Sequence, residues 1–161
     1  MNQAEDALKR LNLQLPPPLA SSIDMALPFS SIRVVDNLAY IAGHGPQGAS
    51  GDIAGPFGKL GRDVSIEEGI EAARRTGLSI LADLRRTLGS LDRIAAWGHV
   101  FVMVNSSPGF SDQPAVANGF SDLILDVFGA EVGRHSRSAI GVAALPFGGI
   151  PVEIEATVHL R

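Results

Sequence analysis

The stretch PVEIEATVHL, residues 151–160, alternates apolar and polar side chains from end to end. Successive side chains of an extended chain point to opposite faces of a sheet, so this pattern predicts a strand with one buried and one polar face. The polar face carries two carboxylates, Glu153 and Glu155. The apolar face requires a packed layer of other elements, which the rest of the chain must supply.

Four further segments are typical of strands. Residues 136–143 come shortly before the C-terminal strand, and residues 100–104, VFVMV, form the apolar, mostly β-branched run expected of a buried central strand. Residues 32–35 and 39–42 are separated by three turn-forming residues. This spacing predicts a hairpin.

Two segments are predicted to be long helices. The first, residues 66–88, begins after Ser65, and Glu68 stands where it completes a capping box. Apolar residues recur along it at three- and four-residue steps, which gives one apolar face. The second is expected over residues 113–128, ending at Gly129.

Two glycines inside the first long helix, Gly69 and Gly77, weaken it locally, and we expect them to permit close packing on the sheet. At the N-terminus, residues 3–12 are expected to form a short amphipathic helix. Pro16, Pro17 and Pro18 prevent its continuation. We therefore expect residues 1–26 to form a helix and a proline-rich extension.

The resulting order β-β-α-β-α-β-β predicts an α/β fold, in which two helices pack on one face of a mixed sheet. The length of 161 residues, with 45% hydrophobic and 19% charged residues, fits a single folded domain over residues 1–161. No internal repeat is present in the sequence.

Composition also excludes several classes of function. The chain has no cysteine, which excludes disulfides, thiolate zinc sites and cysteine nucleophiles. A net charge of -4 and dispersed basic residues disfavour nucleic-acid binding. There is no apolar run of membrane-spanning length and no secretory signal pattern, so we expect a cytoplasmic protein with no membrane partner.

Residues 43–48, GHGPQG, match the dinucleotide-binding pattern G-x-G-x-x-G by letter. A phosphate-binding loop of this kind opens directly into a helix, whereas here further glycines and prolines follow, up to about residue 63. We therefore interpret the segment as a loop without a nucleotide.

The pair Arg137 and Glu153 is the candidate functional centre. Acidic residues that alternate along a strand usually lie on a face exposed to solvent. The spacing of Glu153 and Glu155 by itself fits such a face. The alternative is that this face lines a cleft in which Arg137, at the start of the preceding strand, supplies a cationic partner. The planar fork of an arginine is suited to a carboxylate ligand, because it forms two parallel charge-assisted hydrogen bonds.

The residues around this pair resemble a known family. The stretch RSAIGVAALP, residues 137–146, followed by VEIEA, residues 152–156, resembles the signature of the RidA/YjgF family. Residues 27–37 resemble its first strand, residues 41–46 its glycine-rich turn, and residues 116–118 the start of its second helix. The stretches 112–129 and 133–137 resemble a less characterised bacterial branch of that family.

The resemblance implies a homotrimer with clefts between subunits and no metal or organic cofactor. It also implies hydrolysis of reactive enamine and imine acids of the 2-aminoacrylate type to 2-keto acids and ammonia. By this analogy Arg137 binds the substrate carboxylate and Glu153 positions and polarises the attacking water. The backbone groups of Gly43 and Ala139 complete the substrate cradle.

Several positions depart from the family pattern. Phe29 stands where many members have tyrosine, His44 where glutamine is common, and Ala139 where some have cysteine. His44 fits a loop on the surface as well as a pocket. Asn118 either shapes the pocket or has a structural role, and we expect a structural contact from His135.

Three readings of function follow. The first is an imine or enamine deaminase, which uses both Arg137 and Glu153. The second is a non-catalytic trimer that binds a keto acid or another small carboxylate, motivated by Phe29 and His44. The third is ribonuclease activity, against which the acidic charge and the lack of a basic groove count.

Overall fold

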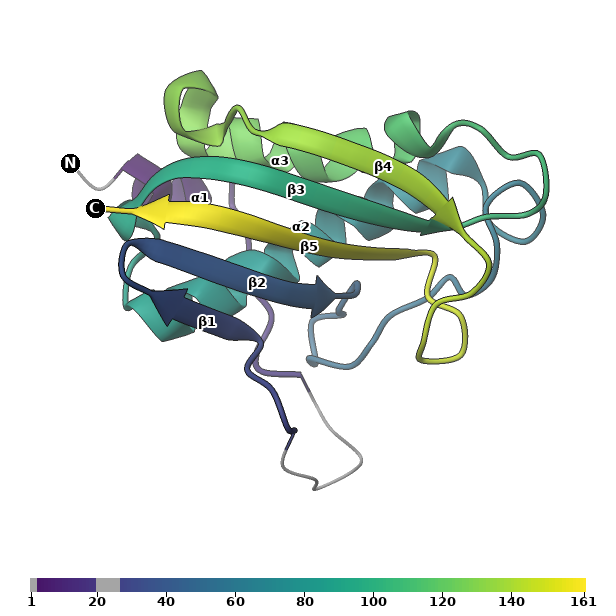
Figure 1. Cartoon of the computed structure of the whole chain (residues 1–161), viewed down its shortest axis with the longest axis horizontal. Helices are drawn as coiled ribbons and strands as arrows, with labels where there is room; N and C mark the ends of the chain where they lie inside the picture. Colours follow the sequence, from purple (N-terminus) through teal and green to yellow (C-terminus); the bar gives the residue numbers. More distant parts are fainter. Residues whose placement is uncertain (1–2, 20–26) are drawn as a thin grey trace.

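A five-stranded sheet forms one layer of the molecule, seen in the computed structural model, which describes residues 3–19 and 27–161 (Figure 1). The strand order is β1-β2-β5-β3-β4. The five strands are β1 (Ile32–Val35), β2 (Leu38–His44), β3 (Ile94–Asn105), β4 (Ser136–Val142) and β5 (Val152–Leu160). β3 and β4 run parallel and all other neighbours are antiparallel. The mixed sheet predicted from the sequence is confirmed.

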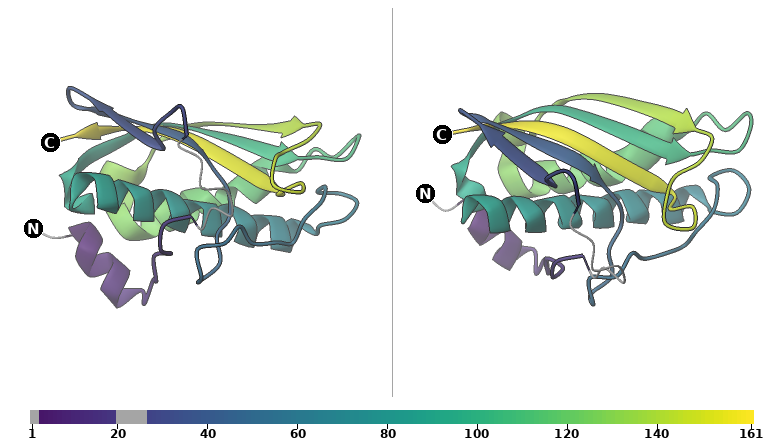
Figure 2. Two further views of the ribbon diagram at one scale, coloured as in Figure 1. Left: turned by 90° about the horizontal axis from the view of Figure 1, so that it is seen from below. Right: turned by 60° about the horizontal axis from the view of Figure 1, so that its bottom comes forward.

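The helices α2 (Ile66–Leu88) and α3 (Gln113–Gly133) pack against each other and together cover one face of the sheet (Figure 2). The short helix α1 (Gln3–Arg10) packs on α3 and on the 3-10 turn η1 (Leu91–Arg93). Part of the expected N-terminal extension, residues 20–26, lies outside the described residues. Within the described residues, no helix combines the length and apolar character needed to cross a bilayer.

The core lies between the helices and the sheet. Val100 and Val102 of β3 and Ile154 of β5 point to the helices and are fully buried. On the opposite side of the sheet, none of the helices formed by residues 3–19 and 27–161 lies over the strands (Figure 2). We call this side the open face; it carries Tyr40 on β2, Met103 on β3, Ile140 on β4, and Glu153 and Glu155 on β5.

The capping box that the sequence predicts for α2 is present: Glu68 N–H donates to Ser65 Oγ, and the Glu68 carboxylate accepts from Ser65 N–H. The expectation that Gly69 and Gly77 face the sheet is wrong. A Cβ at Gly69 would lie 2.7 Å from Leu60, in the loop before α2, and 3.2 Å from Val116; one at Gly77 would lie 2.7 Å from Leu123. Val116 and Leu123 belong to α3, so these glycines allow the two helices to approach each other.

Most predicted bounds differ from the observed ones by two residues or fewer, and two differ by more. β3 begins at Ile94 rather than near residue 100, because its first half pairs with the end of β5 in a bulged register that simple alternation does not reveal. The expected helix end at Gly129 is a kink: Gly129 has φ 71°, and one more helical turn follows. Glycine tolerates this positive φ without steric cost.

Candidate active site

Arg137 lies near the start of β4, at the edge of the sheet, where it is paired with Val100 of β3. Neighbouring residues in a parallel pair point to the same face, so Arg137 projects to the helix side, toward α3. Its Nη1 donates to Asn118 Oδ1 at 2.9 Å and to Ser121 Oγ at 2.9 Å, and its Nη2 donates to the Pro114 carbonyl at 3.3 Å. Helix α3 therefore holds the guanidinium in one place.

The charge of Arg137 has no counterion in this arrangement. All three acceptors are neutral, and within the described part of the chain no carboxylate oxygen lies within 4.0 Å of the guanidinium. A guanidinium has five N–H groups, and three are used here, so two remain. Two N–H groups are what a carboxylate accepts from arginine in a bidentate pair. No described residue accepts a hydrogen bond from these two remaining N–H groups.

Ser121 is a member of this cluster that sequence reasoning missed. Its Oγ accepts from Arg137 and lies 3.0 Å from Nε2 of His135, whose Nδ1 lies 2.8 Å from the Gly133 carbonyl. These contacts fit a neutral His135 that accepts from Ser121 and donates to Gly133. Burial lowers the pKa of His135, as does the nearby charge of Arg137. The signal available was the spacing of Asn118 and Ser121, which places both on one face of a helix.

Ala139 follows Arg137 on the same face of β4, paired with Val102, and its side chain packs against the hydrophobic core. A larger group at this position would have to fit beside that core. Arg137, Asn118 and Ala139 therefore form one cluster of predicted site residues, at the edge between β4 and α3. We call it the arginine cluster.

A second cluster lies at the end of β2. A Cβ built on Gly43 would lie 2.0 Å from Glu153 Oε1 and 2.9 Å from its Cδ, so the Glu153 carboxylate lies directly over the Gly43 backbone. No residue with a side chain fits at position 43 with Glu153 in this place. We call Gly43 and Glu153 the glutamate cluster.

The environment of Glu153 favours its protonated form. Half-burial and the neighbouring charge of Glu155 raise the pKa of Glu153, and His44 opposes this rise. No hydrogen bond from the described residues reaches its carboxylate. A carboxyl group with a raised pKa and unused lone pairs is better suited to accept and return a proton than an ordinary carboxylate is.

Phe29 lies in the segment that leads into β1, and its side chain is 59% exposed. The Ala42 N–H donates to the Ser31 carbonyl at 2.9 Å, which holds this segment beside the end of β2. Phe29 is two residues before Ser31, and Gly43 directly follows the Ala42 that bonds to Ser31. The structure gives it no polar partner, as expected for a phenyl ring.

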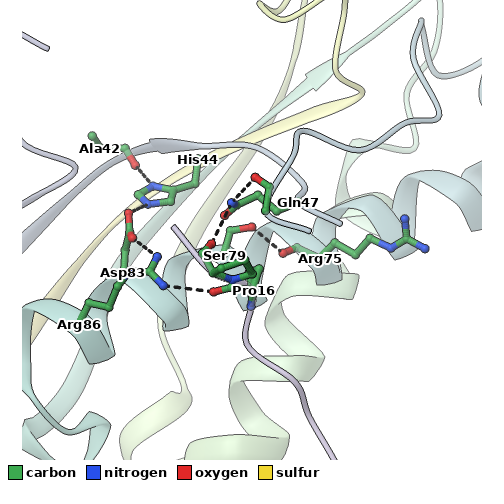
Figure 3. Close-up of polar contacts among 10 residues, drawn as sticks. Pro16, Ala42, His44, Gln47, Arg75, Ser79, Asp83 and Arg86 are labelled. Carbon is green, nitrogen blue, oxygen red and sulfur yellow. Dashed lines mark hydrogen bonds and ion pairs between the residues drawn. The ribbon is translucent and has the colours of Figure 1, made fainter. Parts of the chain in front are cut away.

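His44 points to Asp83 on α2 (Figure 3). It is paired with Ile154, which faces the helices, and its Nε2 lies 2.9 Å from Asp83 Oδ2 on α2, while Nδ1 lies 2.6 Å from the Ala42 carbonyl. Its side chain is only 9% exposed. Both ring nitrogens are engaged by protein groups, so His44 connects β2 to α2 and does not present its ring to a ligand.

Asp83 extends this connection. Burial opposes its ionisation, but hydrogen bonds from His44 and Arg86 prevail and lower the pKa of Asp83 to about 2. Arg86 in turn donates to the Pro16 carbonyl at 3.1 Å, so the proline-rich segment is tied to the same network (Figure 3).

The two clusters do not meet within one chain. β3 separates β4 from β5, with Arg137 level with Val100 and Glu153 level with Met103, three residues further along. Alternation then places Arg137 on the helix side and Glu153 on the open face. From strand spacing the two positions lie about 10 Å apart across the sheet and about 10 Å apart along it.

Comparisons with known proteins agree with this architecture. Residues 19–153 match the family described as "YjgF/chorismate mutase-like, putative endoribonuclease". The chain is 42% identical over 155 residues to protein TCP17 of Trypanosoma cruzi, covering 96% of this chain and 92% of the relative.

Solved structures extend the comparison. The protein Atu1372 from Agrobacterium tumefaciens, of unknown function, is 36% identical, with a TM-score of 0.84 over 98% of this chain and 92% of that one. The Escherichia coli protein TdcF, solved with bound serine, is 16% identical, with a TM-score of 0.60 over 92% of this chain and 98% of that one; it shares the fold. With a family match over most of its length and a close relative across nearly all of it, the chain belongs to the YjgF/RidA family.

Proposed function

We propose that this protein is a homotrimeric deaminase that hydrolyses small enamine and imine acids of the 2-aminoacrylate type to 2-keto acids and ammonia. The observation that carries the proposal is the guanidinium of Arg137, which is held only by neutral acceptors and has two N–H groups to offer a carboxylate. Membership of the YjgF/RidA family and the serine bound by TdcF, an amino acid with a carboxylate, support the same assignment.

In the proposed reaction Arg137 binds the substrate carboxylate and Glu153 acts on water. An enamine substrate first takes a proton on its β-carbon and becomes the imine. Glu153 then accepts a proton as water adds to the imine carbon, and the C–N bond of the resulting carbinolamine breaks once the nitrogen is protonated. Ammonia and a 2-keto acid leave, and no cofactor takes part.

The proposed trimer brings the two clusters together. Tyr40 and Ile140 on the open face are 47% and 42% exposed, and large apolar side chains on an uncovered sheet face are typical of a surface that another subunit covers. The arginine cluster at the β4 edge of one subunit would then border the glutamate cluster on the open face of its neighbour. This assembly gives each site one arginine and one glutamate.

The test is turnover of 2-iminopropionate, generated in the assay from alanine by an amino acid oxidase. We expect the wild-type protein to release pyruvate and ammonia faster than the free-solution reaction, and Arg137→Ala to lose this acceleration. The matched control is Arg10→Ala, which removes an exposed arginine on α1. Equal rates for wild type and Arg137→Ala would refute the proposal, and saturable pyruvate binding without turnover would assign the cleft to binding alone.

A further inference from the structure

A cleft lies at the carboxyl ends of the parallel strands β3 and β4, beyond the arginine cluster. It has a volume of about 550 Å³, and its walls include Lys59, Ser106, Phe110, Gln113 and Ala143. The cleft forms because the chain continues from β3 toward α3 and from β4 toward β5, so the two exits diverge. Crevices outside the carboxyl ends of parallel strands are a recurrent place for ligands in α/β folds.

The Lys59 ammonium lies in the wall of this cleft and is held there by neutral acceptors. Its Nζ donates to Asn105 Oδ1 at 2.9 Å and to the Ala143 carbonyl, and both acceptors are neutral. No carboxylate oxygen of a described residue lies within 4.0 Å of it. An ammonium has three N–H groups, so one is left for a ligand.

The position of Lys59 is fixed on both sides. Its own N–H donates to Asp63 Oδ2 at 3.0 Å, and the N–H of Leu60 donates to the Asn105 carbonyl at 2.8 Å. Asn105 is 3% exposed, and its Nδ2 donates to the Ile150 carbonyl at 3.3 Å, which directs Oδ1 toward the lysine. The ammonium is therefore preorganised, which reduces the entropy that ligand binding would cost.

The floor of the cleft depends on a glycine. A Cβ at Gly141 would lie 2.9 Å from Gln113 Nε2 and 3.0 Å from Ser106 Oγ. Any side chain at position 141 would therefore press into the polar wall of the cleft. The absence of a side chain here leaves Gln113 and Ser106 accessible from the same space as Lys59.

The remaining wall combines an apolar surface with further positive potential. Phe110 and Pro108 line one side. Gln113 begins α3 at the positive end of the helix dipole, where the Asp112 side chain makes no capping hydrogen bond and Pro114 has no N–H; the Asp112 carboxylate offsets part of this positive potential. This helix end by itself does not make an anion site, but beside Lys59 it adds to the attraction for an anion.

We propose that this cleft binds a small anionic metabolite whose carboxylate or phosphate group lies on Lys59 and whose apolar part lies along Phe110. The volume is in the range of small-molecule sites. The cleft lies further along the same strand than Arg137: Gly141, on its floor, is four residues beyond Arg137, about 13 Å along an extended strand, while Gln113 adjoins Pro114, whose carbonyl accepts from Arg137. The protein thus has two anion sites on the same pair of parallel strands.

The experiment uses the fact that the full chain contains only two lysines, Lys9 and Lys59. Protein labelled with ¹⁵N-lysine gives two backbone amide signals, and the Lys9 signal is the internal control, because its side chain is 79% exposed on α1. The probes are benzoate and phenyl phosphate, with neutral benzyl alcohol for comparison. We expect the Lys59 signal to shift saturably with at least one anion and the Lys9 signal to stay in place.

Calorimetry on variants locates the binding. Lys59→Met should weaken binding of the anion by about tenfold or more, and Lys9→Met should bind it as the wild type does. Gly141→Ala keeps Lys59 and should also weaken binding, so the result does not depend on how well Lys59→Met folds. No saturable shift with either anion, an equal response to benzyl alcohol, or unchanged affinity in both cleft variants would overturn the proposal. The choice of anion separates a carboxylate from a phosphate ligand.

Discussion

Arg137 and Glu153 lie on opposite faces of one sheet, two strands apart, although the proposed reaction uses both. The separation is a consequence of register, because Arg137 shares the face of buried Val100 and Glu153 shares the face of Met103. A site that uses both residues requires a second subunit. The predictions below test each half of that site and then their combination.

The neutral character of the acceptors around Arg137 is central to anion binding. Asn118→Ala removes one hydrogen bond and should weaken pyruvate binding by about threefold to tenfold, the effect of one such bond. Asn118→Asp keeps the shape but gives Arg137 a carboxylate partner, so it should weaken binding more than alanine does. Calorimetry checks the order of the two variants; tighter binding in Asn118→Asp than in Asn118→Ala would contradict this account.

The raised pKa of Glu153 predicts the acid side of the pH profile. If Glu153 accepts the proton from water, kcat/KM should fall as the pH drops through a pKa above the ordinary carboxyl range, since the carboxylate is then protonated. Glu153→Gln should lose turnover but keep ligand binding.

Glu155→Gln is the matched control on the same strand face. Burial and the charge of Glu155 both raise the pKa of Glu153, so removal of that charge should move the acid limb to lower pH while turnover persists. The measurement is kcat/KM as a function of pH for both variants. If the acid limb of the profile does not move in Glu155→Gln, the limb does not report the titration of Glu153.

The Glu153 carboxylate packs against the Gly43 backbone, in the space that a side chain at position 43 would occupy. Gly43→Ala puts a Cβ 2.0 Å from the present position of Oε1, so the carboxylate must move by about an ångström or more. A displacement of this size should lower kcat by about 100-fold, with pyruvate affinity changed much less. Gly48→Ala is the control, because its Cβ would meet its neighbours at an ordinary 3.9 Å. Full activity in Gly43→Ala would remove Glu153 from the mechanism.

The His44–Asp83 contact predicts a stability effect outside the active site. Asp83→Asn weakens the hydrogen bonds to His44 and Arg86 and should lower the free energy of unfolding by about 1–3 kcal/mol, measured in urea near pH 7. The folded-state pKa of Asp83, about 2, lies below its ordinary value of 3.8. Its contribution is therefore fully present above about pH 4 and is lost as the pH falls through about 2. An Asp83→Asn protein as stable as wild type would show the contact to be unimportant.

Alternation and capping signals were enough to predict most of the fold. The strict period of residues 151–160 and the Ser65–Glu68 capping box are local, and both appear in the structure as predicted. The first half of β3 was missed because bulges there interrupt the register with β5. The partners of Gly69 and Gly77 were assigned to the wrong layer, because a sequence shows that a helix approaches something closely but not what it approaches.

The site was predictable only in part, and for the same reason. Arg137, Asn118 and Glu153 came from resemblance and from residue chemistry, whereas Ser121 became visible only when α3 was placed beside β4. The direction of His44 depends on a bulge between Ile41 and His44, which sets the face to which its ring points. Such long-range geometry has no signature in local spacing.

The most direct test of the central claim mixes two inactive variants. Arg137→Ala and Glu153→Gln are unfolded together, refolded at equal concentrations and assayed with 2-iminopropionate, beside each variant refolded alone. If every site takes Arg137 from one subunit and Glu153 from its neighbour, random trimers contain intact sites at about one quarter of the wild-type number, and activity should return to about that level. If the mixture stays as inactive as its two components while forming mixed trimers, the two residues do not act together across a subunit boundary.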